Sequence, residues 1–77
     1  MKALEVVADK TGKRMMVYLS KIVMFADRGN GLTEIHCVHR GVFKIRIPYD
    51  KFVEMMVHEK QLTYFTNEDY EDDPTVP

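Results

Sequence analysis

The sequence contains a single cysteine, Cys37, and no apolar run long enough to cross a bilayer. One cysteine cannot form an internal disulfide, and a membrane-spanning helix needs about 20 predominantly apolar residues. The first residues also lack the long apolar core and small-residue cleavage site of a secretory signal peptide. We therefore expect a cytoplasmic protein that does not associate with a membrane.

Residue types that build metal or catalytic centres are sparse or unsuitably spaced. His36 and His39 are an odd number of residues apart, so on a strand they point to opposite faces, and no CxxC or HxxxH pair adds further metal ligands. Cys37 is expected to face the core, where a thiol is unreactive, and no base is evident beside Ser20. We expect no enzymatic activity, no catalytic residues, no bound metal and no cofactor.

Charge is distributed unevenly along the 77 residues. Residues 1–67 carry all 11 Lys and Arg and 7 of the 12 Asp and Glu, a net charge of +4. Residues 68–77 carry the other 5 acids and no base, a net charge of −5. Such a composition buries too little apolar surface to order itself. The sequence therefore predicts one small β-rich domain over residues 1–67 and a disordered acidic tail over residues 68–77.

Turn-forming residues divide the first two thirds of the chain into short segments with the two-residue period of strands. The pattern is clearest in VFKIRI, where Phe43, Ile45 and Ile47 alternate with charged residues. It recurs in TEIHCVH, where Ile35 and Cys37 alternate with polar residues. One face of each segment is therefore expected to be buried. We predict strands over residues 4–8, 15–19, 21–26, 32–39 and 42–47.

The stretch DRGNG, residues 27–31, suits a hairpin loop because Gly and Asn tolerate positive φ. A loop of this length pairs Phe25 with Thr33 and Val23 with Ile35. A phosphate-binding loop would instead need a following helix whose amides face the anion, and the residues that follow alternate like a strand. We therefore interpret DRGNG as a turn.

A second hairpin is predicted from the turn residues between the last two segments. A loop at Arg40–Val42 pairs Cys37 with Ile45, so that apolar side chains meet on one face. The same register brings His36 opposite Arg46 on the exposed face.

After Pro48 the apolar period lengthens to that of an amphipathic helix. The apolar residues of this stripe are Tyr49, Phe52, Val53 and Met56. The predicted fold is α+β and mainly β: a small antiparallel sheet or partly open barrel of about five strands, followed by one C-terminal amphipathic helix.

The run LSKIVMFADRGNGLTEIHCVHRGVFKIRIPYDKFVEMM, residues 19–56, resembles the first half of the LytTR-type DNA-binding domain and the small flagellar FlbD-like proteins. The resemblance covers about half of the chain. It implies the same order of strands, turns and helix, with nucleic-acid binding as an implied activity. The sequence then departs from the LytTR pattern, which continues with further strands and loops that contact DNA. The matching positions are Ile22, Phe25, Asn30, Thr33, Ile35, Gly41, Ile45, Phe52 and Met56.

Small size, exposed sheet edges and a Met-rich helix favour a non-enzymatic regulatory or adaptor domain that acts through protein–protein interaction, with self-association as one form of it. One alternative is a LytTR-like nucleic-acid-binding module that the acidic tail modulates. Another is an acidic mimic that inhibits a nucleic-acid-binding partner. Basic and turn residues supply the predicted partner contacts, which are Arg28, Asn30, His36, Arg40, Lys44 and Arg46.

Overall fold

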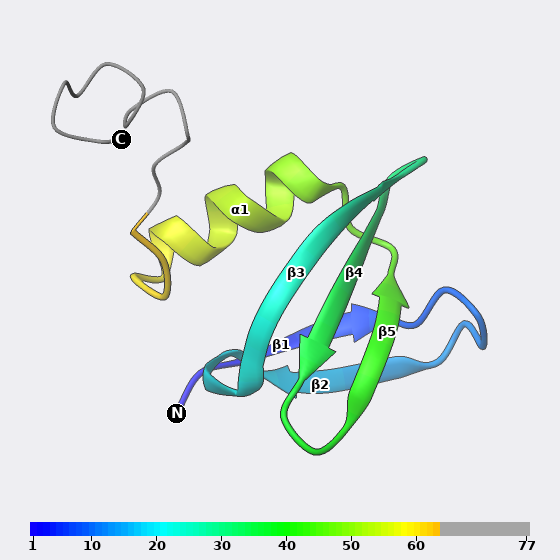
Figure 1. Cartoon of the computed structure of the whole chain (residues 1–77), viewed down its shortest axis with the longest axis horizontal. Helices are drawn as coiled ribbons and strands as arrows, with labels where there is room; N and C mark the ends of the chain where they lie inside the picture. Colours follow the sequence, from blue (N-terminus) through cyan, green and yellow to red (C-terminus); the bar gives the residue numbers. More distant parts are fainter. Residues whose placement is uncertain (64–77) are drawn as a thin grey trace, which may run out of the picture.

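The computed structural model describes residues 1–63, which form five β-strands followed by one α-helix (Figure 1). This arrangement confirms the mainly β fold with a final helix. The predicted disorder of residues 68–77 falls outside the described residues. A short 3₁₀ turn, η1 (Leu19–Lys21), joins the second strand to the third. The other elements are β1 (Ala3–Val7), β2 (Arg14–Tyr18), β3 (Ile22–Gly29), β4 (Leu32–Cys37), β5 (Gly41–Ile45) and α1 (Tyr49–His58).

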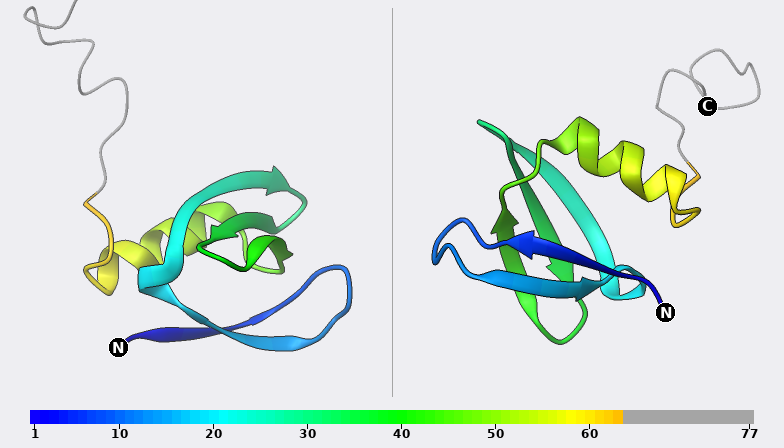
Figure 2. Two further views of the ribbon diagram at one scale, coloured as in Figure 1. Left: turned by 60° about the horizontal axis from the view of Figure 1, so that its bottom comes forward. Right: turned by 180° about the vertical axis from the view of Figure 1, so that it is seen from behind.

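The strands form two antiparallel sheets, β1–β2 and β3–β4–β5, which are not closed into a barrel. The two sheets meet at one corner through an antiparallel bridge between Ala8 and Ile45. Two backbone hydrogen bonds of 2.8 and 3.0 Å flank this bridge. Helix α1 lies on the side of the three-stranded sheet that faces the β1–β2 hairpin (Figure 2). The fold is therefore a bent pair of sheets with the helix between their open ends.

The predicted turn at DRGNG is confirmed, but it is tighter than the sequence indicated. Only Asn30 and Gly31 lie between β3 and β4, and both take positive φ, at 55° and 76°. Two left-handed residues match the twist of a two-residue hairpin loop. A bulge between Asp27 and Gly29 then shifts the register by one residue, so that Phe25 pairs with Ile35. The predicted pairs Phe25–Thr33 and Val23–Ile35 are both wrong.

The second hairpin turns at residues 38–40, two residues earlier than predicted. A positive φ of 62° at His39 allows the early turn, and the following glycine already belongs to β5. The register changes by an even number of residues, so every side chain keeps its predicted face. The observed pairs are Cys37–Gly41 and His36–Val42, in place of Cys37–Ile45 and His36–Arg46.

The hydrophobic core lies between the two sheets and α1. Phe52 of α1 is fully buried, and its ring packs edge-on against Phe25 of β3, with the centroids 4.8 Å apart. The one buried polar side chain among the described residues, Thr33, donates its hydroxyl to the Ile47 carbonyl at 2.7 Å. The core residues are Val6, Val17, Leu19, Ile35, Ile45, Phe52 and Met56.

The described part of the chain contains no helix with the length and apolar character needed to cross a membrane.

Candidate functional site

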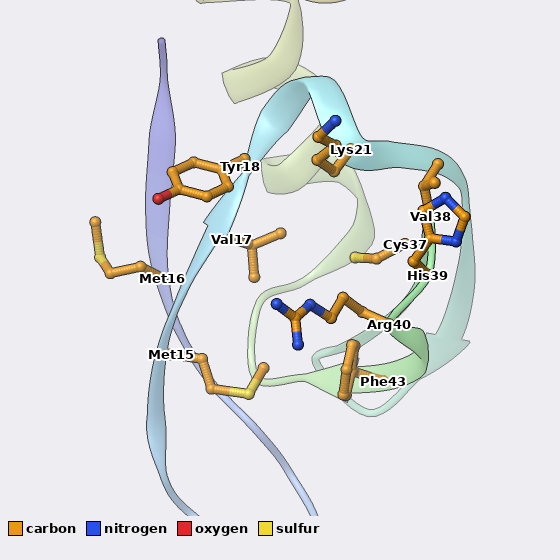
Figure 3. Close-up of a pocket in the computed structure, with 10 residues that line it drawn as sticks. All are labelled: Met15, Met16, Val17, Tyr18, Lys21, Cys37, Val38, His39, Arg40 and Phe43. Atoms are coloured by element: carbon orange, nitrogen blue, oxygen red, sulfur yellow. The ribbon is translucent and has the colours of Figure 1, made fainter.

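A groove of about 490 Å³ lies between β2 and the turn that joins β4 to β5 (Figure 3). The Val38 N–H donates to the Lys21 carbonyl at 2.9 Å, which holds this turn beside η1 and fixes one wall of the groove. A second cavity of about 590 Å³ also borders β5 and shares Met15 and Phe43 with the first. The groove is lined by Met15, Met16, Val17, Tyr18, Lys21, Cys37, Val38, His39, Arg40 and Phe43.

The groove follows an edge of β2 and not only one of its faces. Four consecutive residues of the strand, 15–18, line it. Successive side chains of a strand point to opposite faces, and Figure 3 shows Met15 and Val17 directed toward the β4–β5 turn with Met16 and Tyr18 directed the other way. Residues that point to opposite faces of the strand can line one cavity only where that cavity reaches the strand's backbone. The edge of β2 that does not pair with β1 therefore borders the groove.

The hydrogen bonds of the β1–β2 hairpin show which backbone groups face that edge. At one end the Leu19 N–H donates to the Lys2 carbonyl at 3.0 Å, and at the other the Ala8 N–H donates to the Lys13 carbonyl at 2.9 Å. Bonding residues alternate along an antiparallel pair, so the odd-numbered residues of β2 bond to β1. Met16 is even-numbered and directs its N–H and C=O to the open edge. Within residues 1–63, β2 pairs with no second strand that would satisfy them.

The ionisable side chains that give the groove its charge are basic. Lys21, His39 and Arg40 line it, and no carboxylate does so among the described residues. The Arg40 side chain extends into the gap between β2 and Phe43 (Figure 3). Neither Lys21 nor Arg40 makes an ion pair within residues 1–63. The groove therefore combines apolar walls, a free strand edge and positive charge.

Three of the predicted partner residues gather around Glu34, on the face of the three-stranded sheet opposite the core. His36 Nε2–H donates to the Glu34 carboxylate at 2.7 Å, Arg28 Nε lies 3.7 Å from it, and Lys44 is its cross-strand neighbour. The hydrogen bond from His36, together with these positive charges, holds the pKa of Glu34 below its ordinary value. This cluster neutralises itself in part, so its cations are less available to an anionic ligand.

The other three predicted residues lie apart from that cluster. Arg46 Nε lies 3.4 Å from an Asp9 carboxylate oxygen, beside the β1–β2 turn. Asn30 occupies the β3–β4 turn. Of the six predicted residues, Arg40 lines the groove and Lys44 lines the second cavity. The sequence prediction missed the residues of β2. A signal was present, because in MMVY the residues on both faces of the strand are apolar or aromatic.

Cys37 is half-buried in the wall of the groove, and burial raises the pKa of its thiol. The thiol is therefore protonated at neutral pH, the form that is a poor nucleophile. No group of three or more His, Cys, Asp or Glu side chains within residues 1–63 is arranged to hold a metal ion.

Comparison with protein-family models, with curated proteins and with solved structures finds no match to this chain.

Proposed function

We propose that this protein is a small non-enzymatic adaptor or regulatory domain that binds an extended segment of a partner protein along the open edge of β2. The observation that carries the proposal is a groove bordered by a strand edge whose Met16 N–H and C=O have no backbone partner within residues 1–63. A segment that adds to the sheet as a further strand satisfies these groups, and side-chain contacts in the groove select its sequence.

The character of β2 supports this use of its edge. Natural edge strands are usually protected by proline, by inward-pointing charge or by a bulge. The one charge of β2 is Arg14 at its first residue, and the following MMVY contains none of these features, with Met16 65% exposed. A strand that is apolar on both faces and open along one edge is suited to pairing with another chain.

The groove also indicates the chemistry of its partner. Met15, Val17 and Phe43 offer an apolar wall, and Lys21 and Arg40 offer positive charge. Side chains alternate along an extended segment, so the preferred ligand alternates apolar with acidic residues.

The alternative of nucleic-acid binding has less support. Arg28, His36 and Arg46 were expected to contact a partner, and each lies within 4 Å of a carboxylate. Phosphate binding relies on cations that are free to replace the counterions of the nucleic acid.

A peptide-binding assay tests the proposal. Fluorescent peptides of about eight residues that alternate valine with aspartate, with lysine or with serine are titrated with the full chain, and anisotropy is measured. We expect the aspartate peptide to bind most tightly.

Met16→Pro is the decisive variant because it removes the donor at the open edge without removing a bond to β1. It should weaken binding by about tenfold, since an edge hydrogen bond contributes about 1 kcal/mol and the ring hinders close approach. Met16→Ala is the matched control and should change affinity by less than about threefold. Equal binding by Met16→Pro and Met16→Ala would show that the strand edge is not the binding element.

A further inference from the structure

We propose that residues 68–77 of this chain, EDYEDDPTVP, occupy the groove of the same molecule and so regulate access to it. The inference rests on the proposed function of the groove. Three observations support it: the charge of the groove, the place where the described chain ends, and the residue pattern of the segment.

The first observation is charge complementarity. Lys21, His39 and Arg40 line the groove, and no acidic residue of the described chain lies in its wall. Residues 68–77 carry 5 of the 12 acids of the chain and no Lys or Arg. Crowded carboxylates repel one another, and this repulsion is relieved beside fixed cations. The most acidic segment of the chain thus matches a basic groove whose Lys21 and Arg40 have no ion-pair partner within residues 1–63.

The second observation is that the described chain ends near one end of the groove. After α1, the Glu59 carbonyl accepts a hydrogen bond from Lys2 Nζ at 2.8 Å, and the Lys2 carbonyl accepts one from the Leu19 N–H at 3.0 Å. Leu19 directly follows Tyr18, which lines the groove. All views in Figures 1 and 2 place the end of α1 on the same side of the molecule as the N-terminus and the end of β2. The linker of four residues, 64–67, adds a reach of at most about 14 Å beyond the described chain.

The third observation is the pattern of the segment itself. Residues 68–73 contain no proline or glycine, and they span about 20 Å when extended. That length is sufficient to lie along the five residues of β2. Tyr70 provides one large apolar ring for the wall formed by Met15 and Phe43. Pro74 then ends the strand pairing, because proline has no backbone N–H to donate.

Occupation in the same molecule has a regulatory consequence. A short linker gives the segment an effective concentration on the order of 1 mM at the groove. A partner segment must therefore displace it, and binding by the partner becomes sensitive to salt, which screens the contacts of Lys21 and Arg40.

A competition experiment with full-length proteins tests this inference. The probe is a fluorescent peptide with the sequence of residues 67–74, NEDYEDDP. It is titrated with the wild-type chain and with a tail-neutral variant that carries Glu68→Gln, Asp69→Asn, Glu71→Gln, Asp72→Asn and Asp73→Asn. We expect the tail-neutral variant to bind the probe at least about tenfold more tightly, because its own segment no longer competes.

Two controls separate occupation of the groove from a general change in charge. The full-length Tyr70→Pro variant keeps all five acids of the segment but cannot extend as an uninterrupted strand, and it should also bind the probe more tightly than the wild type. In the tail-neutral background, Arg40→Glu should reduce binding of the probe at least about tenfold, since it reverses a charge inside the groove. Lys51→Glu makes the same change of charge on the exposed side of α1 and should leave affinity nearly unchanged.

The outcomes distinguish the two proposals. Tighter binding by both tail variants, lost on Arg40→Glu, supports both. Equal binding by the wild type and both tail variants overturns occupation by residues 68–77 and leaves the groove as a binding site. If none of these proteins binds the probe at low salt, and the alternating aspartate peptide also fails to bind, the proposed function of the groove is wrong.

Discussion

The loss of stability caused by a proline in β2 should depend on the edge of the strand that the lost N–H faces. Met15 pairs with Val6 in the bonding phase of the β1–β2 hairpin, whereas Met16 directs its N–H to the open edge. Met15→Pro therefore removes a hydrogen bond of the ladder, and Met16→Pro removes none. The two substitutions are adjacent and involve the same residue types. The difference between their effects on stability therefore shows which edge of β2 each backbone N–H faces.

The expected magnitudes differ by enough to measure. Met15→Pro leaves the carbonyl of Val6, a residue only 2% exposed, without its donor, and an unsatisfied buried group costs about 1–3 kcal/mol. The proline ring also collides with the neighbouring strand, which brings the loss of stability to about 3 kcal/mol or more. Met16→Pro should cost about 1 kcal/mol, from the restriction of φ alone. A domain of this size is stable by only about 5 kcal/mol, so Met15→Pro removes most of that stability.

Urea unfolding followed by far-UV circular dichroism measures both values. Met15→Ala and Met16→Ala correct for the loss of each side chain. If the two prolines destabilise the domain equally after this correction, the open edge of β2 does not lie at Met16, and the strand-addition proposal loses its basis.

Three further predictions concern the rest of the sheet. Thr33→Val should lower the free energy of unfolding by about 1–3 kcal/mol because the Ile47 carbonyl loses its 2.7 Å donor. Thr33→Ser keeps that donor and should lower it by only about 1 kcal/mol. Equal losses of stability in urea unfolding would contradict the role of the hydroxyl. Gly31→Ala should cost about 1 kcal/mol because φ is 76° there, while Asn30→Gly is tolerated, and a reversed order would contradict the assigned turn. The pKa of Glu34 is lower in the folded state than its ordinary value of 4.5, so the folded protein takes up this proton less readily than the unfolded chain. The contribution of Glu34 to stability is therefore present above about pH 4.5 and is lost as the pH falls through the folded-state pKa. Glu34→Gln should therefore flatten the acid limb of a thermal-melting profile between about pH 3 and 6, and an unchanged limb would show that the contacts with His36 and Arg28 do not favour the folded state.

Periodicity in the sequence was sufficient to predict the elements of this fold but not their pairing. The alternation around Ile35 and Ile45 fixed which side chains are buried, and both are fully buried. The register depends on the residues that take positive φ at each turn. The Asn-Gly pair was a usable signal for a two-residue loop, whereas the left-handed His39 was not, since any of several polar residues near it could have closed the turn.

The groove could not have been predicted from local patterns because it depends on how the two sheets meet. Its walls are set by the Ala8–Ile45 bridge and by the hydrogen bond from Val38 to Lys21, which join segments far apart in the sequence. Composition did single out Arg40 as a partner residue. It gave no reason to place that side chain beside β2, because a basic residue in a turn is more often simply solvated.

An open edge on β2 also makes self-association a hazard, and the proposed position of residues 68–77 offers protection against it. A segment lying along the edge of β2 blocks pairing with another molecule, and its acids repel a second copy. The tail-neutral variant should therefore form dimers at concentrations where the wild type sediments as a monomer, and adding Met16→Pro should restore the monomer. Sedimentation velocity at several protein concentrations measures this. Dimers that persist in the presence of Met16→Pro would mean that loss of charge alone drives association, and that another surface carries it. The three exposed apolar side chains Val23, Met24 and Val42 of the three-stranded sheet would then be the next surface to test.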